Sequence, residues 1–199
     1  MTRAALPLVL LFAGPALGQA ACPVAADLPR GIRVAYDDGT TEVFRATGAP
    51  GIIAVQGTFE DGTGYRLELG QGVHLLSYTP TLMEGGLDTA GRVDYDYGRA
   101  VEDLPVVTPG RRFDTPVRVA DQFGPRSEAQ SQAYGAEEIL TIASCSYRAV
   151  PVMIAYDTPN QYVEALRFLP ELGFALLNRQ ESTDQPGRVI EPVAIRAGK

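Results

Sequence analysis

Apolar and polar residues alternate with a period of two over much of the chain. The alternation is clearest over Ile32–Tyr36 and over residues 65–69, and each of these segments lies beside an Asp-Gly pair, Asp38-Gly39 or Asp61-Gly62. A period of two places successive side chains on opposite faces of a strand, and Asp-Gly tolerates the positive φ angles of a tight hairpin turn. Residues 32–78 are therefore predicted to form five consecutive antiparallel strands, a β-meander.

The pattern is looser in the middle of the chain and regular again toward its end. Residues 93–97 alternate tyrosine with aspartate and predict a strand, whereas the polar stretch 122–131 is predicted to be a long loop that a protease would cut first. Residues 162–169 are predicted to be a strand, with a short helix as the alternative because the apolar spacing also fits a helical face. Residues 189–195 are predicted to be the last strand, and Pro192 indicates that this strand lies at an edge.

These segments predict an all-β fold with around ten strands and at most one short helix. The architecture expected is an antiparallel meander forming one curved sheet or a partly open barrel. With 21 glycines and 15 prolines, the chain has frequent turn residues that favour short elements over long helices. Residues 22–199 are predicted to form a single β-rich domain.

The N-terminus has the features of a secretory signal. Arg3 precedes an apolar run over residues 4–13, Gly14-Pro15 breaks that run, and small residues follow at 16–21. We expect residues 1–21 to be a cleaved signal peptide and the protein to be exported to the periplasm. The apolar run is about half of the roughly 20 residues that a membrane-spanning helix needs, so no transmembrane segment is predicted.

The two cysteines, Cys22 and Cys145, are 123 positions apart and form no Cys-x-x-Cys motif. In an oxidising compartment two such thiols usually pair, and a disulfide between Cys22 and Cys145 is predicted. The alternative is a lipid anchor on Cys22. Gln19 stands three positions earlier, where a lipoprotein signal usually carries an aliphatic residue, so the disulfide is preferred.

Composition excludes several classes of function. The formal net charge is −7, which argues against nucleic acid as a partner because phosphates require a basic surface. Lys199 is the single lysine and stands at the last position, which excludes a Schiff-base lysine and a P-loop. No cofactor is predicted.

Candidate catalytic and metal-binding groups are few. His74 is the single histidine and no Gly-x-Ser-x-Gly motif is present, so a serine triad is not expected. Asp94 and Asp96 resemble the opening of a calcium loop, but tyrosine stands between them and the strand pattern explains the same residues; a metal site is therefore not predicted. Paired carboxylates among Glu60, Asp61, Glu137 and Glu138 are the candidates for a hydrolase.

One part of the chain resembles a known group of proteins. The segments are 137–142, Cys145-Ser146-Tyr147, Tyr156 and Phe168-Leu169-Pro170-Glu171-Leu172-Gly173. Together they resemble uncharacterised exported β-meander proteins of alphaproteobacteria and, more loosely, the open curved sheets of periplasmic lipoprotein carriers. The resemblance covers about the last third of the chain. It implies a fold and a compartment and carries no catalytic residues.

The function predicted is that of an exported, non-catalytic β-domain that acts through binding or envelope assembly. Its partner would be an envelope protein or an apolar small molecule. The first alternative is a carrier that holds an apolar ligand inside the curved sheet, and the second is a carboxylate-based hydrolase. The aromatic residues available to line the carrier's cavity are Tyr36, Phe59, Tyr65, Tyr95, Phe168 and Phe174. Sequence periodicity does not separate a hollow interior from a packed one, whereas an apolar cavity of several hundred Å³ would favour the carrier.

Overall fold

The structure, a computed structural model, describes residues 21–83 and 85–198. The predicted signal peptide, residues 1–21, lies outside this part of the chain apart from Ala21. The described residues form fourteen strands: β1 (Ile32–Tyr36), β2 (Thr41–Ala46), β3 (Ile52–Thr58), β4 (Gly64–Gly70), β5 (His74–Thr81), β6 (Val93–Asp96), β7 (Arg112–Asp121), β8 (Gly124–Tyr134), β9 (Glu138–Ile142), β10 (Cys145–Tyr156), β11 (Val163–Leu169), β12 (Phe174–Ser182), β13 (Gln185–Val189) and β14 (Pro192–Ala197).

All strand pairs are antiparallel and belong to one sheet. The strand order is β13-β12-β11-β10-β8-β7-β6-β5-β4-β3-β2-β1-β14, and β9 pairs with β10 beside this path. The predicted five-stranded meander corresponds to β1–β5, where each strand pairs with the next. The all-β prediction is thus confirmed.

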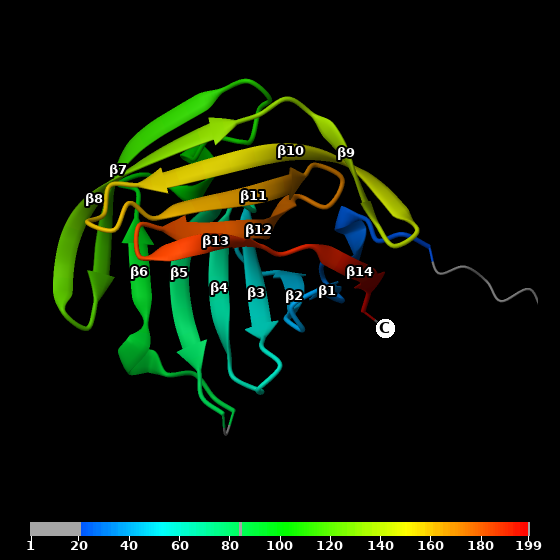
Figure 1. Cartoon of the computed structure of the whole chain (residues 1–199), viewed down its shortest axis with the longest axis horizontal. Helices are drawn as coiled ribbons and strands as arrows, with labels where there is room; N and C mark the ends of the chain where they lie inside the picture. The colour runs from blue at the N-terminus through cyan, green and yellow to red at the C-terminus, as the bar shows by residue number, and fades with distance from the viewer. Residues whose placement is uncertain (1–20, 84, 199) are drawn as a thin grey trace, which may run out of the picture.

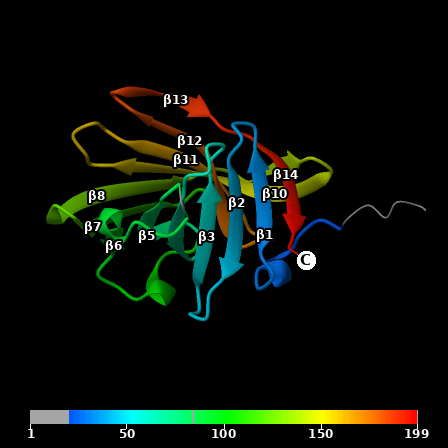
Figure 2. The ribbon, with the colours of Figure 1, turned by 90° about the horizontal axis from the view of Figure 1, so that it is seen from below.

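The sheet curves back on itself. Figure 1 shows β10–β13 running across β1–β5, with β7 and β8 bending around one side, and Figure 2 shows the same curve from below. We call β10–β13 the front arm and β1–β5 with β14 the rear arm. The sheet stays open, because β13 and β14 stand at opposite ends of the strand order.

The two arms pack against each other around an aromatic pair. Phe44 of β2 and Phe174 of β12 stack with ring centroids 4.0 Å apart, and both side chains are almost fully buried. Leu169, Leu172 and Ile142 complete the front side of this cluster, and each is fully buried. Such apolar burial stabilises a fold by about 25 cal/mol per Å² and fixes the arms at this end of the sheet.

A short link joins the two edges of the sheet. The chain leaves β13 on the front arm and enters β14 on the rear arm through Ile190 and Glu191 alone. The prediction of one strand over residues 189–195 is therefore wrong, because the strand breaks at this link. Pro192 does lie on an edge strand, as expected: β14 pairs with β1 on one side only.

The predicted loop over residues 122–131 is also wrong. Residues 124–134 form β8, which pairs with β7 along ten residue pairs from Arg112↔Ala133 to Asp121↔Gly124. The strand alternates in burial, but the side chains that it buries include Glu128, Gln130 and Gln132. Because many of the inward-facing residues of β8 are themselves polar, its sequence does not show the alternation of apolar and polar residues that predicts a strand.

Residues 162–169 are extended as preferred, with β11 paired to β10 and β12. The helical content of the described chain is three single turns of 3₁₀ helix, Ala25–Asp27, Thr89–Gly91 and Val101–Asp103. None of the described helices is long and apolar enough to cross a membrane.

Candidate functional site

A cavity of about 570 Å³ lies between the arms of the sheet. Its size falls within the roughly 300–1,000 Å³ of small-molecule sites. The cavity is lined by Tyr36, Asp38, Thr40, Glu42, Phe44, Val55, Phe59, Tyr65, Leu67, Leu69, Val73, Leu75, Tyr78, Tyr95, Arg126, Glu128, Tyr156, Thr158, Asn160, Tyr162, Glu164, Leu166, Ala175, Leu177, Gln180 and Ile190. Both arms therefore contribute to its wall, as does the bend between them, which is formed by β6, β7 and β8.

Polar and apolar lining residues occupy different ends of the strands. In the rear arm Glu42 lies next to the β1–β2 turn, whereas Phe44 lies farther along the same strand. In the front arm Glu164 lies near the start of β11 and pairs with Gln180, whereas Leu166 lies farther along and pairs with Leu177. Each arm therefore lines the cavity with aliphatic side chains along one part of its strands and with tyrosines and carboxylates along the other.

The rear arm holds one carboxylate between two tyrosines. The hydroxyl of Tyr36 donates to Glu42 Oε2, and the hydroxyl of Tyr65 donates to Oε1 at 2.7 Å. Burial raises the pKa of the Glu42 carboxyl, although both tyrosine hydrogen bonds act to lower it. Burial and the Glu42 charge raise the pKa of Tyr36 and Tyr65 well above the ordinary value, so both hydroxyls stay protonated and serve as donors.

The front arm repeats this arrangement with other residues. The hydroxyls of Tyr156 and Tyr162 donate to the two carboxylate oxygens of Glu164, at 2.7 Å and 3.0 Å. The side-chain amide of Gln180 also donates to Glu164, at 3.2 Å. Two Tyr–Glu–Tyr clusters, one on each arm, thus line the same cavity.

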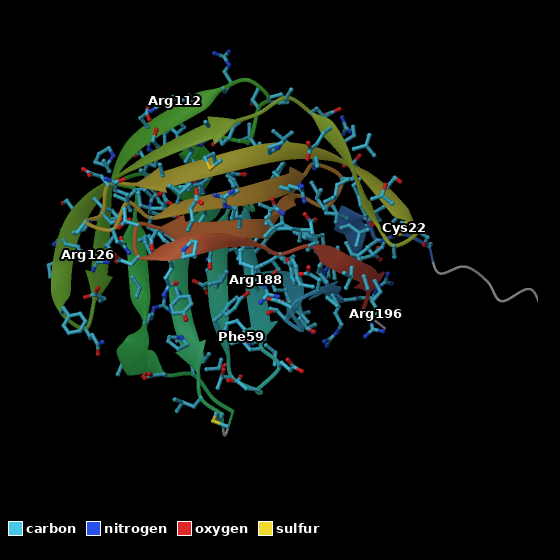
Figure 3. The ribbon with its side chains drawn as sticks, in the orientation of Figure 1. Cys22, Phe59, Arg112, Arg126, Arg188 and Arg196 are labelled. Carbon is cyan, nitrogen blue, oxygen red and sulfur yellow. A yellow bond between two sulfur atoms is a disulfide. The ribbon has the colours of Figure 1, made fainter. Side chains whose placement is uncertain are left out.

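The bend between the arms supplies further polar groups. Arg126 and Glu128 line the cavity from β8, and Tyr95 lines it from β6. Burial, with smaller contributions from Glu128 and Glu164, raises the pKa of Tyr95 to about 12. Figure 3 labels Arg126 on β8 and Phe59 beside the β3–β4 turn, two lining residues that come from well-separated parts of the sheet.

The structure places four of the six predicted lining aromatics in the cavity wall: Tyr36, Phe59, Tyr65 and Tyr95. Phe174 lies instead in the packed core against Phe44. Phe168 packs against a second apolar cluster and does not line the cavity. Both faces of β11 and β12 meet apolar neighbours, so the sequence alone did not show which aromatics turn inward to an open space.

The other candidate residues lie away from the cavity. Asp94 pairs with Arg92 at 2.7 Å, and Asp96 accepts from the backbone N–H of Gly98 at 2.8 Å. In the part of the chain that the structure describes, no three His, Cys, Asp or Glu side chains are grouped to hold a metal ion.

The carboxylates proposed for a hydrolase lie at the surface as well. Asp61 accepts hydrogen bonds from Thr63 in its turn, beside Glu60. Glu137 pairs with Arg148 at 3.6 Å, and Glu138 pairs with Arg167 at 3.3 Å. None of these four carboxylates lines the cavity.

His74 belongs to a buried hydrogen-bond network rather than to the cavity wall. Its Nε2 lies 2.8 Å from the carbonyl oxygen of Pro105, which can only accept, so Nε2 carries the proton. Its Nδ1 then accepts from the side-chain amide of Gln132 at 3.2 Å. Burial lowers the pKa of His74, and the neutral ring joins residues 99–108 to β8.

The structure joins Cys22 to Cys145 through a disulfide, with the two Cα atoms 5.6 Å apart. Further contacts hold the same segment. The hydroxyl of Tyr147 donates to the carbonyl oxygen of Pro23 at 3.2 Å, and the N–H of Ala25 donates to the carbonyl oxygen of Glu171 at 3.0 Å. The start of the described chain is thereby fixed to the front arm.

Sequence reasoning missed the three glutamates of the cavity, Glu42, Glu128 and Glu164. Glu164 stands two positions after Tyr162, and Glu42 stands two positions before Phe44, so each shares a strand face with an aromatic side chain. That spacing was the available signal. It was ambiguous, because a carboxylate within an alternating strand usually faces solvent.

No family model matches the chain, and no curated protein matches it in sequence. Among solved structures, the hypothetical lipoprotein YmcC from Escherichia coli is similar, with a TM-score of 0.45, 11% sequence identity, and coverage of 82% of this chain and 83% of that chain. A similarity at this level carries no functional argument. The resemblance to exported proteins of alphaproteobacteria remains a prediction.

Proposed function

We propose that the protein binds a small amphiphilic molecule between the arms of its curved sheet and acts as a non-catalytic carrier. The observation that supports this proposal is the cavity of about 570 Å³, whose wall combines aliphatic side chains with tyrosines and carboxylates on both arms. A packed interior would have favoured the more general role in envelope assembly. Pockets of this size with mixed lining are typical of small-molecule sites.

The hydrogen bonds around two of the lining glutamates support a preformed site. Glu42 and Glu164 are each held by two tyrosine hydroxyls before any ligand is bound. A site whose polar groups are already oriented loses less conformational entropy when a ligand binds. The aliphatic part of the lining offers Leu67, Leu75 and Leu177 to an apolar chain.

We also propose that the protein is exported and works in the periplasm. The disulfide between Cys22 and Cys145 supports an oxidising compartment. A sulfur engaged in a disulfide cannot also carry a thioether-linked lipid, so this bond and a lipid anchor on Cys22 are mutually exclusive. Intact-mass measurement of protein from the native host should show a chain that starts near Ala21, has lost two hydrogens and carries no lipid. A diacylglyceryl group on Cys22 would contradict this location.

Binding can be tested with N-phenyl-1-naphthylamine, a neutral apolar dye whose emission rises in apolar surroundings. We expect saturable fluorescence enhancement with the wild-type protein. The variants Leu67→Trp on the rear arm and Leu177→Trp on the front arm fill the cavity from opposite sides and should each weaken dye binding at least about fivefold.

The matched control is Ala120→Trp, which places the same side chain on an exposed position of β7 outside the cavity. It should bind the dye within about twofold of wild type. Thermal melts establish that each variant is folded. The carrier proposal fails if the wild-type protein gives no saturable enhancement, or if both filling variants bind as well as the control.

A further inference from the structure

We propose that the ligand's polar head is cationic, an ammonium or quaternary ammonium group seated among the carboxylates and tyrosines of the cavity. This inference rests on the proposed function and specifies the class of ligand. The charge, burial, unpaired polar atoms and aromatic surface of the cavity lining support it.

Charge is the first observation. Four acidic residues line the cavity, Asp38, Glu42, Glu128 and Glu164, against a single basic residue, Arg126. Arg126 is already paired with Asp121, which lies outside the lining. Over residues 21–83 and 85–198, none of the three glutamates forms a salt bridge. The negative charge of the cavity is therefore not balanced by the protein itself.

Burial makes this imbalance significant. Glu42 is 4% exposed and Glu128 is 9% exposed. A buried carboxylate is costly unless a cation or several donors compensate it. Tyrosine hydroxyls and an amide donate to these glutamates, but no cationic side chain among the described residues pairs with them; a cationic head would supply that opposite charge, whereas an anionic head would meet like charge.

Unpaired polar atoms in the cavity lining are an independent observation. The side-chain amide of Gln130 donates to Glu128 Oε1 at 3.1 Å, but Oε2 of Glu128 accepts no hydrogen bond from the described residues. The hydroxyl of Thr40, a residue that is 8% exposed, likewise has no partner there. Both side chains line the cavity, so these atoms are available to a ligand.

Aromatic side chains in the lining also support a cationic head. The rings of Tyr65 and Tyr78 lie with centroids 6.1 Å apart on the rear arm, and those of Tyr156 and Tyr162 lie 5.3 Å apart on the front arm. All four residues line the cavity. Aromatic faces attract cations, and combined with carboxylates they favour an alkylammonium group whose charge is spread over carbon atoms.

The test compares three amphiphiles that share a ten-carbon chain: decyltrimethylammonium, decanoate and decyl glucoside. Isothermal titration calorimetry on the full mature protein, below the micelle concentration of each compound, gives the three dissociation constants. We expect the ammonium compound to bind at least about tenfold more tightly than the other two.

Variants separate the site from the general acidity of the protein. Glu164→Gln keeps an acceptor for the tyrosine hydroxyls but removes the charge, and should weaken the ammonium compound about tenfold while leaving decyl glucoside unchanged. Glu102→Gln removes the same charge from an exposed position outside the cavity and should change ammonium binding by less than about twofold.

The outcomes distinguish the two proposals. Equal affinity for the three compounds, tighter binding of decanoate or the glucoside, or equal effects of the two variants would overturn the cationic head and leave the carrier intact. Failure of all three compounds and of the neutral dye to bind would overturn both proposals.

Discussion

The backbone N–H of Asp37 donates to the carbonyl oxygen of Glu191 at 3.0 Å, and the N–H of Glu191 donates to Asp37 Oδ1, also at 3.0 Å. Asp37 follows β1, and Glu191 lies in the two-residue link between the edges of the sheet. This reciprocal pair ties the link to the rear arm beside Ile190, a lining residue of the cavity. It holds in place the link that connects β13 of the front arm to β14 of the rear arm.

Asp37→Ala should therefore lower stability modestly. Loss of one exposed hydrogen bond costs about 0.5–1.5 kcal/mol, which corresponds to a fall of roughly 1–6 °C in melting temperature for a chain of this size. Asp37→Asn retains the acceptor oxygen and should melt close to wild type. Thermal melts of the three proteins provide the measurement. Equal destabilisation by both variants would mean that loss of the acceptor oxygen is not the cause of the lower melting temperature.

Removal of the disulfide should lower stability without dissolving the sheet. The bond closes a separation of 123 residues, for which the chain-entropy model gives about 4–5 kcal/mol. The double variant Cys22→Ser/Cys145→Ser should melt roughly 10–20 °C lower than wild type. Far-UV circular dichroism at low temperature should be unchanged, because the strands pack around their own apolar core. Loss of the β signal at low temperature would show that the core is insufficient without the bond.

Glu42 should make stability depend on pH in a specific direction. Because burial raises its carboxyl pKa in the folded state, Glu42 favours folding most below the ordinary glutamate pKa. That contribution is lost as pH rises through the raised pKa. Glu42→Gln cannot ionise and retains an acceptor for the tyrosines, so it isolates this contribution while the neighbouring Asp38 stays in place.

The measurement is urea unfolding of wild type and Glu42→Gln at several pH values between about 4 and 8. The free energy of unfolding of wild type minus that of the variant should decrease as pH rises. A difference that is constant or increases with pH would contradict the assignment of Glu42 as a buried carboxyl of raised pKa.

Much of the fold could be predicted from the sequence because its strands mostly bury apolar residues. The meander of β1–β5 followed from the alternation of side chains and from the two Asp-Gly turns. The edge position of Pro192 followed from its missing N–H. In these segments local pattern and final environment agree.

The features that escaped prediction depend on polar side chains facing inward. Strand β8 buries Gln130 and Gln132 against Tyr97 and His74, so its sequence has the polarity of a loop. Glu42 and Glu164 escaped prediction for the same reason, because a carboxylate in a strand of alternating side chains normally faces solvent. Tyr65 is 23 positions from Glu42, whereas the two tyrosines that bind Glu164 lie within eight positions of it. Which polar face turns inward is decided by the curvature of the whole sheet.

The most direct test of the account is to locate the chain of a bound amphiphile by NMR. With methyl groups of leucine and valine labelled, decyltrimethylammonium should give nuclear Overhauser contacts to Val55, Leu67, Leu75 and Leu177, which line the cavity from both arms. Val189 and Val193 are half-exposed, lie outside the lining and should give none. Contacts that include both arms would establish that the ligand lies between them. Contacts confined to Val189, Val193 or other exposed methyl groups would contradict a ligand site inside the curved sheet.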